Sequence, residues 1–297
     1  MRVAVTGAGG LVGSTLVPRL TAGGHQVVPA ARRSGGAGGL QWDPERGLVD
    51  SSRWEGFDAV IHLAGENIGE GRWTASQKEK IRTSRVVGTR KLAEGLAALQ
   101  TPPRTLICAS AIGFYGSRGA ELLTEQSPAG TGFLAGVCQE WESSADPLRA
   151  AGVRVVHARF GIILSPRGGA LQKMLLPFQL GAGGIVGSGQ QYWSWVAIDD
   201  VASALEFLLG ADQLRGPVNV VAPEAVTNAQ FTHALGRVLH RPTLIPMPAF
   251  AARLALGEMA DELLLASARV VPQQLTAAGF TFHHPQLEPA LHSLLNR

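Results

Sequence analysis

Three glycines at a spacing of three residues could bind phosphate groups. Gly7, Gly10 and Gly13 follow the apolar run Val3–Val5 and open a segment with helical periodicity over residues 11–22. In this context the first glycine permits a tight turn, the second a close approach of backbone to a pyrophosphate, and the third close helix–strand packing. The pyrophosphate accepts hydrogen bonds from free N–H groups at the helix start. The spacing therefore predicts a dinucleotide site at Gly7, Gly10, Leu11, Val12 and Gly13.

Two arginines follow the second expected strand, residues 26–31, where one side chain usually selects the dinucleotide. An acid there accepts hydrogen bonds from the ribose 2′-hydroxyl of NAD, whereas arginine pairs with the 2′-phosphate of NADP. The run from Val28 to Ser34 contains Arg32 and Arg33 and no acid. It favours NADP(H) over NAD(H). The alternative is that both arginines are solvated surface residues.

The elements that must position these residues alternate along the first 160 residues. Extended, apolar runs at 3–5, 26–31, 59–63, 105–109 and 153–158, with a short piece near 40–42, alternate with helical patterns at 11–22, 76–99 and 133–150. Such strands, each followed by a helix, indicate a parallel sheet covered on both faces. We therefore expect an α/β fold of the Rossmann type, with a doubly wound parallel sheet.

The later part of the chain has a different pattern. Glycine-rich loops lie at 181–189, a helix is expected over 201–209 and a strand over 217–221, and the pattern from Asn228 onward is mainly helical. We predict an NADP(H)-binding Rossmann domain over 1–225, to which the late segments return. Residues 226–297 are predicted to form a small, mainly helical C-terminal domain on the substrate side.

Charge and composition narrow the classes of partner. The 26 basic and 23 acidic residues are scattered through the 297 residues, which argues against nucleic-acid binding. No run of 18 apolar residues predicts a membrane span, and the first residues do not resemble a signal peptide. Cys108 and Cys138 are expected to be buried, inert thiols, with no disulfide framework and no metal site. We expect a cytoplasmic monomer or homodimer.

Several further runs resemble the extended short-chain dehydrogenases/reductases of the NAD-dependent epimerase/dehydratase family. The matching runs are 58–65 after the fourth strand of that family, 87–89 in the following helix, 110–116 beside the nicotinamide, and 195–201 at a later strand-to-helix turn. The resemblance implies cofactor contacts from Leu63, Ala64, Gly65, Ser110 and Phe160.

A narrower match resembles an atypical subgroup, the epimerase family proteins, related to short-chain dehydrogenase/reductase family 39U. It is carried by residues 72–74, Lys78, Ile81, Ser84–Arg85 and 88–89, and by a C-terminal pattern over 246–282. The resemblance covers essentially the whole chain, and its C-terminal pattern is more specific than the glycine loop.

The catalytic pair of the wider family is missing. Those enzymes use Tyr-x-x-x-Lys, in which the tyrosine exchanges a proton with the substrate and the lysine lowers the tyrosine pKa and holds the ribose. The chain has two tyrosines, Tyr115 and Tyr192, and the residues four positions later are Gly119 and Val196. The helix expected to carry the pair, near 132–142, contains neither residue type. The usual serine is shifted or lost, with Ser110 one place before the matching position.

Other residues could supply the missing chemistry. Tyr115 is the leading replacement for the proton donor, with Ser110 beside it, although a packing role for Tyr115 is the competing interpretation. Glu66 and Asn67 could contact substrate or cap a loop. Arg72, Trp73 and Lys78 could line a pocket for an anionic substrate or form a solvated helix start. Core packing is expected for Trp193, Trp195 and His157.

Two functions therefore remain open. The first is an NADP(H)-dependent oxidoreductase, or an enzyme like a nucleotide-sugar epimerase, acting on an unidentified small molecule. Loss of tyrosine and lysine leaves hydride transfer possible, because the nicotinamide carries that chemistry. The second is a catalytically silent protein that uses NADP(H) occupancy to control a partner.

Overall fold

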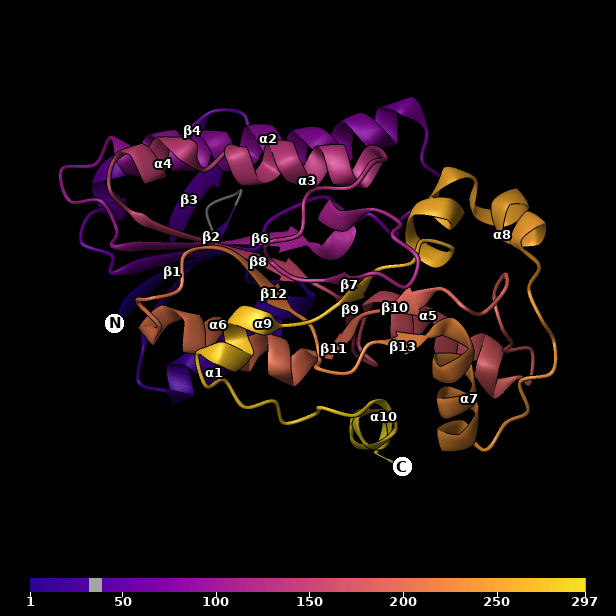
Figure 1. Ribbon diagram of the computed structural model, residues 1–297. Helices are drawn as coiled ribbons and strands as arrows, with labels where there is room; N and C mark the ends of the chain where they lie inside the picture. The colour runs from indigo at the N-terminus through magenta and orange to yellow at the C-terminus, as the bar shows by residue number, and fades with distance from the viewer. Residues whose placement is uncertain (32–38, 297) are drawn as a thin grey trace.

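An eight-stranded sheet forms the centre of the computed structural model, which describes residues 1–31 and 39–296 (Figure 1). The strand order is β12-β8-β6-β5-β1-β2-β3-β4, and every neighbouring pair is parallel except β3 and β4. The strands are β1 (Arg2–Thr6), β2 (Gln26–Ala31), β3 (Leu40–Asp43), β4 (Gly47–Val49), β5 (Ala59–His62), β6 (Thr105–Ala111), β8 (Arg154–Phe160) and β12 (Gly216–Val220). The predicted Rossmann-type fold is confirmed.

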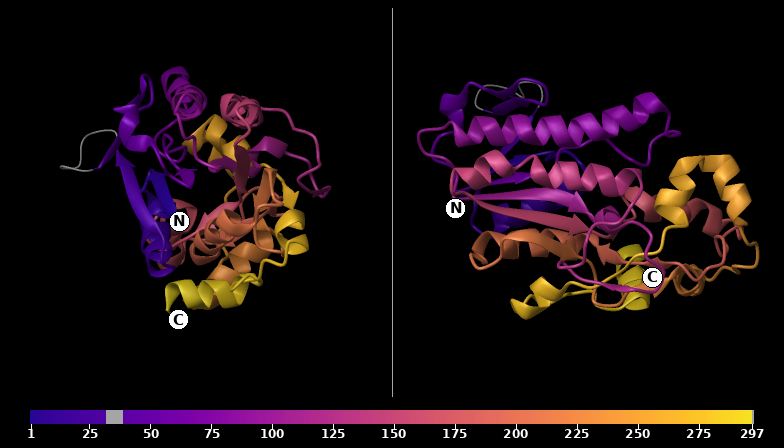
Figure 2. Two further views of the ribbon diagram at one scale, coloured as in Figure 1. Left: turned by 90° about the vertical axis from the view of Figure 1, so that its left-hand side faces the viewer. Right: turned by 45° about the horizontal axis from the view of Figure 1, so that its top comes forward.

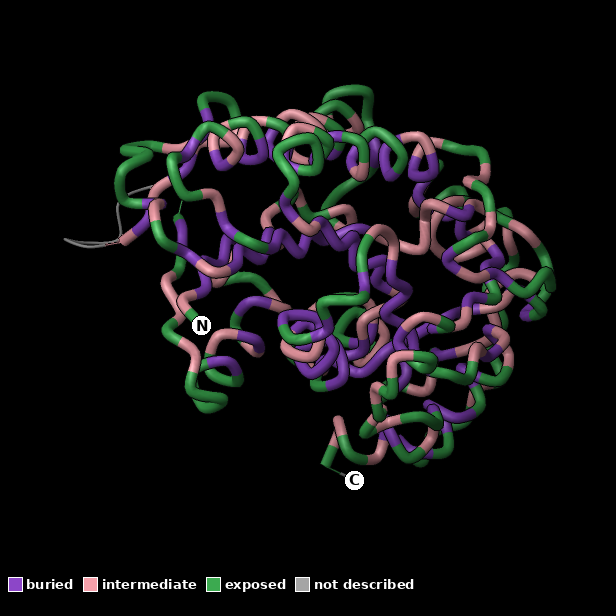
Figure 3. The backbone as a smooth tube through the Cα atoms, turned by 60° about the vertical axis from the view of Figure 1, so that its left-hand side comes forward, coloured by how far each residue is buried: buried purple, intermediate pink, exposed green. Residues whose placement is uncertain are grey.

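Helices cover both faces of this sheet (Figures 1 and 2). One layer contains α2 (Ala75–Ala97), α3 (Phe133–Ser143) and α4 (Asp146–Ala150); the other contains α1 (Leu11–Ala22), α6 (Ile198–Gly210) and α9 (Gln273–Ala277). Burial explains the apolar strands: all four residues of β5 are buried, as are four of the five in β1. Figure 3 shows the same buried centre between more exposed helices.

The expected helix over 133–150 is instead two helices. A turn at Ser144 and Ala145 separates α3 from α4, and Pro147 lies in the first turn of α4. Proline has no N–H to donate to the carbonyl of the preceding turn, so α3 cannot continue through it. The helical pattern in the sequence was correct, but one boundary was missed.

A second core forms the lobe at the right of Figure 1. Three helices contribute to it: α5 (Gly169–Gln179), α7 (Asn228–Leu239) and α10 (Leu287–Leu295). Two short strand pairs complete it. In one, β9 (Ile162–Leu164) pairs with β11 (Trp195–Ala197), and in the other, β10 (Tyr192–Trp193) pairs with β13 (Val226–Thr227). The helix α8 (Ala249–Leu256) and a π-helical turn, Ala260–Leu264, extend it. Residues on both sides of position 225 therefore share this core, and the predicted domain boundary stays a prediction.

Two short turns and one further strand pair complete the path of the chain. The 3₁₀ turn Ser51–Trp54 precedes β5, and the 3₁₀ turn Ile112–Tyr115 follows β6. The strand β7 (Leu122–Leu123) pairs with β14 (Arg269–Val270) and so joins the C-terminal segment to the sheet domain. Leu275 of α9 returns to the main core. None of the helices within the described ranges has the length and apolar character needed to cross a membrane.

Candidate functional site

The glycine loop is closed tightly against the end of a neighbouring strand. Gly7 has φ +70°, and a Cβ added there would lie 2.8 Å from the backbone nitrogen of Ala64. A Cβ added to Gly13 would lie 2.3 Å from the carbonyl oxygen of Gly7. Two of the three glycines are therefore required by the packing of this loop itself.

The start of α1 leaves backbone donors for a ligand. Gly10 precedes the helix and offers no side-chain cap, the first turn has no acid, and the first intrahelical bond is donated by the Ser14 N–H to the Gly10 carbonyl. The N–H groups of Leu11, Val12 and Gly13 have no helical acceptor, which is the arrangement that binds phosphate.

The strand order reverses at this point. The chain passes from β1 to β2 on one side, whereas β5 lies on the other side of β1, so the carboxyl ends of β1 and β5 form the crevice where doubly wound sheets bind ligands. Leu63, Ala64 and Gly65 follow β5 directly, and the Leu63 N–H donates to the Thr6 carbonyl at 3.2 Å. These three residues therefore lie beside the glycine loop, and their cofactor contacts stay a prediction.

A buried polar network holds this edge in place. The two ring nitrogens of His62 lie 2.7 Å from the Thr6 hydroxyl and 3.1 Å from the Thr89 hydroxyl, and the indole N–H of Trp141 donates to Thr89 at 2.9 Å. Burial lowers the pKa of His62 to about 4, so the ring is neutral. The motif 87–89 thus connects β1, β5, α2 and α3.

Apolar side chains of α3 face the place where the catalytic pair was expected. A Cβ added to Gly113, just after β6, would lie 3.2 Å from Leu134 Cβ and 3.9 Å from Cys138 Sγ. Leu134 and Cys138 have the four-residue spacing of Tyr-x-x-x-Lys, and both are buried. Burial raises the pKa of Cys138 to about 12, so its thiol is protonated at neutral pH. Leu134 and Cys138 therefore offer neither an acid nor a base at neutral pH, and the carboxylate on this face of α3, Glu142, lies one turn further along.

Ser110 and Tyr115 already have protein partners. The Ser110 hydroxyl donates to Glu142 at 2.7 Å, and Glu142 also accepts two hydrogen bonds from Arg159, at 2.7 and 2.8 Å. The Tyr115 hydroxyl donates to Asn219 at 2.7 Å and accepts from Arg159 at 2.9 Å. Tyr115 is fully buried, and burial raises its pKa. These contacts favour the packing interpretation of Tyr115, while catalytic roles for it and Ser110 stay predictions.

The residues predicted for the substrate side contact the C-terminal lobe. Arg72 donates to the carbonyls of Leu254 and Ala255, and Lys78 pairs with Glu258 at 2.8 Å. Trp73 is buried in a small apolar cluster of α2, α3 and the C-terminal helices.

The two loop residues of that prediction lie between β5 and α2. The Glu66 N–H donates to the Ser84 hydroxyl at 3.0 Å, and the Asn67 side-chain oxygen accepts from the Gly69 N–H, which is the loop-capping contact considered above. A substrate role for these five residues stays a prediction.

The remaining predicted residues are placed as follows. Phe160 is buried at the end of β8, beside Ala111 of β6. Arg32 and Arg33 lie outside the described residues, while the described part of β2 contains no acid. Trp193, Trp195 and His157 are buried in the cores, as expected. Within the described part of the chain, no group of three or more His, Cys, Asp or Glu residues could hold a metal ion.

Sequence reasoning missed Arg85, which lies against Gly65, one of the residues predicted to contact the cofactor. A Cβ added to Gly65 would lie 3.6 Å from Arg85 Cζ and 3.7 Å from both terminal nitrogens, so one face of the guanidinium covers Gly65. The guanidinium carbon lies 5.1 Å from the ring centre of Trp141. A signal was present, because Arg85 shares the helical spacing of the buried residues Ile81, Gly88–Thr89 and Leu92.

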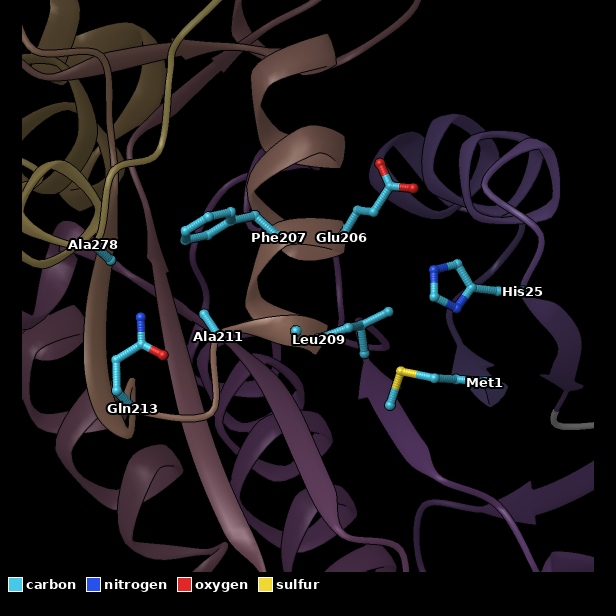
Figure 4. Close-up of a pocket in the computed structure, with 9 residues that line it drawn as sticks. Met1, His25, Glu206, Phe207, Leu209, Ala211, Gln213 and Ala278 are labelled. Atoms are coloured by element: carbon cyan, nitrogen blue, oxygen red, sulfur yellow. The ribbon is translucent and has the colours of Figure 1, made fainter.

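A surface hollow elsewhere is not this site. Met1, His25, Glu206, Phe207, Gln213 and Ala278 are among its lining residues (Figure 4). It lies before β1 and at the end of α6, which is the amino end of the parallel strands, whereas ligands of doubly wound sheets bind at the carboxyl end.

Comparison with known families and proteins gives matches along almost the whole chain. Residues 3–221 match the model of the NAD dependent epimerase/dehydratase family, and residues 247–294 match a domain of unknown function, DUF1731. An epimerase family protein of Mycobacterium bovis is 43% identical over 290 residues, which span 97% of this chain and 96% of that protein.

Solved structures show the same likeness. The human epimerase family protein SDR39U1, crystallised with NADPH, is 33% identical, with a TM-score of 0.90 and complete coverage of both chains. A nucleoside-diphosphate sugar epimerase from Corynebacterium glutamicum is 38% identical, with a TM-score of 0.83 over 99% of this chain and 58% of that one.

Proposed function

Because the chain belongs to the NAD-dependent epimerase/dehydratase family, we propose that it binds NADP(H) and transfers hydride to or from an unidentified small molecule. The observation that carries the proposal is the loop of Gly7 and Gly13, closed too tightly for a Cβ at either position, which leads into the uncapped start of α1 with its free N–H groups. Such a loop fits a pyrophosphate. When bound, the nicotinamide would supply the hydride chemistry.

Preference for NADP(H) rests on the end of β2. The described strand carries no acid that could accept a hydrogen bond from a 2′-hydroxyl, and Arg32 and Arg33 follow it in the sequence. The similarity to a human protein crystallised with NADPH supports the same choice. Arginine pairs with a 2′-phosphate through charge-assisted hydrogen bonds.

The cofactor preference is tested by Arg32→Ala. We expect this variant to weaken NADPH binding at least tenfold and NADH binding less than twofold, measured by titration calorimetry on the folded protein. Equal weakening of both cofactors would remove the basis for the preference.

A second function is favoured by one specific observation. The residues of α3 that face Gly113 at the spacing of the missing pair are Leu134 and Cys138, and the hydroxyls of Ser110 and Tyr115 are already bonded within the protein. A silent protein that binds NADP(H) and controls a partner would need none of these groups. The two functions are separated by incubating the protein with NADPH and a panel of carbonyl compounds and measuring NADPH oxidation. Turnover supports the oxidoreductase, whereas tight NADPH binding without turnover across the panel supports the silent protein.

A further inference from the structure

The guanidinium of Arg85 has few partners for its position. Among the described residues it makes one hydrogen bond, from a terminal N–H to the Ile81 carbonyl at 3.2 Å, and no carboxylate lies within ion-pair distance. Arginine carries five N–H donors, so most of them have no protein acceptor here. Arg82, one turn earlier on α2, instead pairs with Glu140 at 2.5 Å.

The surroundings of Arg85 make this lack of partners costly. The side chain is half-buried beside Gly65 and the ring of Trp141. This burial lowers its pKa below the usual value, and the charge of Glu66, which lies beyond ion-pair distance, opposes the shift only in part. A charge that is partly removed from water is stabilised by a counter-charge or by hydrogen bonds. A bound group that offers oxygen acceptors would supply them.

The location indicates which group that is. Trp141 and Cys138 are neighbours on one face of α3, three residues apart, and Cys138 faces the segment that follows β6. In the resemblance described above, that segment lies beside the nicotinamide, and this helix should carry the lysine that holds its ribose. Arg85 reaches the same place from the adjacent helix α2.

We propose that Arg85 replaces the missing lysine and binds oxygens of the nicotinamide mononucleotide half of NADP(H). Gly65 is next to this arrangement, because a Cβ at that position would be in van der Waals contact with the guanidinium. The proposal rests on the proposed function, since it assigns one more residue to the same cofactor site.

Binding of two probes to matched variants tests the proposal. NADPH contains both halves of the cofactor, whereas adenosine 2′,5′-bisphosphate carries only the adenosine ribose with its 2′- and 5′-phosphates. We expect Arg85→Gln to weaken NADPH binding at least tenfold and to leave binding of the bisphosphate within twofold of the wild type. Arg82→Gln, the control on the same helix, should leave both affinities unchanged.

Each other outcome has a defined meaning. Unchanged NADPH affinity in Arg85→Gln, or equal loss for both probes, would overturn the inference while leaving NADP(H) binding in place. If Arg85→Gln does not fold, Arg85→Lys replaces it. That variant retains the charge but loses the planar fork, and we expect a smaller loss confined to NADPH. A wild-type protein that binds neither probe would overturn the proposed function itself.

Discussion

Replacing Gly13 by alanine tests the closeness of the glycine loop to α1. The added Cβ would lie 2.3 Å from the Gly7 carbonyl oxygen and 2.6 Å from Ala8 Cα, where ordinary contacts begin at 3.4 Å. Relief of this overlap requires a backbone shift of about 1 Å, and overpacking of a well-packed site costs about 1–3 kcal/mol. The atoms that must move are backbone atoms, so no side-chain rotation can absorb the strain.

The same shift displaces the N–H groups that would bind a pyrophosphate. If about 2 kcal/mol of binding energy is lost, the dissociation constant for NADPH rises about 30-fold, because 1.4 kcal/mol corresponds to tenfold. Titration calorimetry with NADPH gives this constant, and guanidinium unfolding gives the change in the free energy of unfolding.

Gly9→Ala is the matched control in the same loop. Nothing lies within 4 Å of a Cβ added to Gly9, and its φ is not positive. This variant should keep its NADPH affinity and should be neutral or more stable by up to about 1 kcal/mol, because alanine restricts the unfolded chain. If Gly13→Ala matched Gly9→Ala in both measurements, the packing described for this loop would be refuted.

Two further predictions concern stability. Burial lowers the pKa of His62 and of His157 to about 4, so each ring stays neutral in the folded protein while the unfolded chain takes up a proton below pH 6.5. The free energy of unfolding should therefore fall as the pH drops from 6.5 to about 4, by about 1.4 kcal/mol per pH unit for each histidine. Urea unfolding at pH 6.5 and at pH 5 measures this fall in the free energy of unfolding. The fall should be smaller in His62→Gln than in the wild type, and should equal the wild-type fall in His233→Gln. Equal falls in the wild type and both variants would contradict the assignment. Glu262 accepts hydrogen bonds from the first two N–H groups of α3, at 3.1 and 3.2 Å, so Glu262→Ala should lower the free energy of unfolding by about 1 kcal/mol. The exposed Glu258 provides the comparison, because removal of its ion pair with Lys78 should cost about 0.5 kcal/mol or less in the same unfolding assay, and the same cost at both positions would contradict the helix-capping role.

The parallel, doubly wound sheet could be predicted because its signals are local and repeated. Each buried strand is an apolar run followed by a helical pattern, and the second strand has the predicted bounds, residues 26–31. The end of α3 was missed because Pro147 had to be weighed against a continuous helical pattern. The small helical lobe was predicted, but its short strand pairs were not, because they join segments far apart in sequence, such as β10 and β13.

Part of the candidate site could also be predicted from the sequence, and part could not. The glycine loop was predictable, since its residues are contiguous and their backbone conformation requires glycine. Partners of Ser110 and Tyr115 were not, because Glu142, Arg159 and Asn219 reach them from three different elements. A helical pattern could have identified Arg85 as a charge on a buried face, but only the structure shows that no carboxylate in the described chain pairs with it.

The distribution of unpaired donors argues for a site organised around cofactor binding. The glycine loop that leads into α1 contacts Leu63 and Ala64, and the guanidinium of Arg85 contacts Gly65. The uncapped start of α1 and this guanidinium both offer N–H groups without protein acceptors. On the α3 side, by contrast, Leu134 and Cys138 are apolar at neutral pH and Ser110 is already bonded. A fold that retained catalysis through the usual pair would have its unpaired groups on α3. Here they lie beside residues 63–65, so this arrangement supports the proposed cofactor binding more directly than it supports proton transfer.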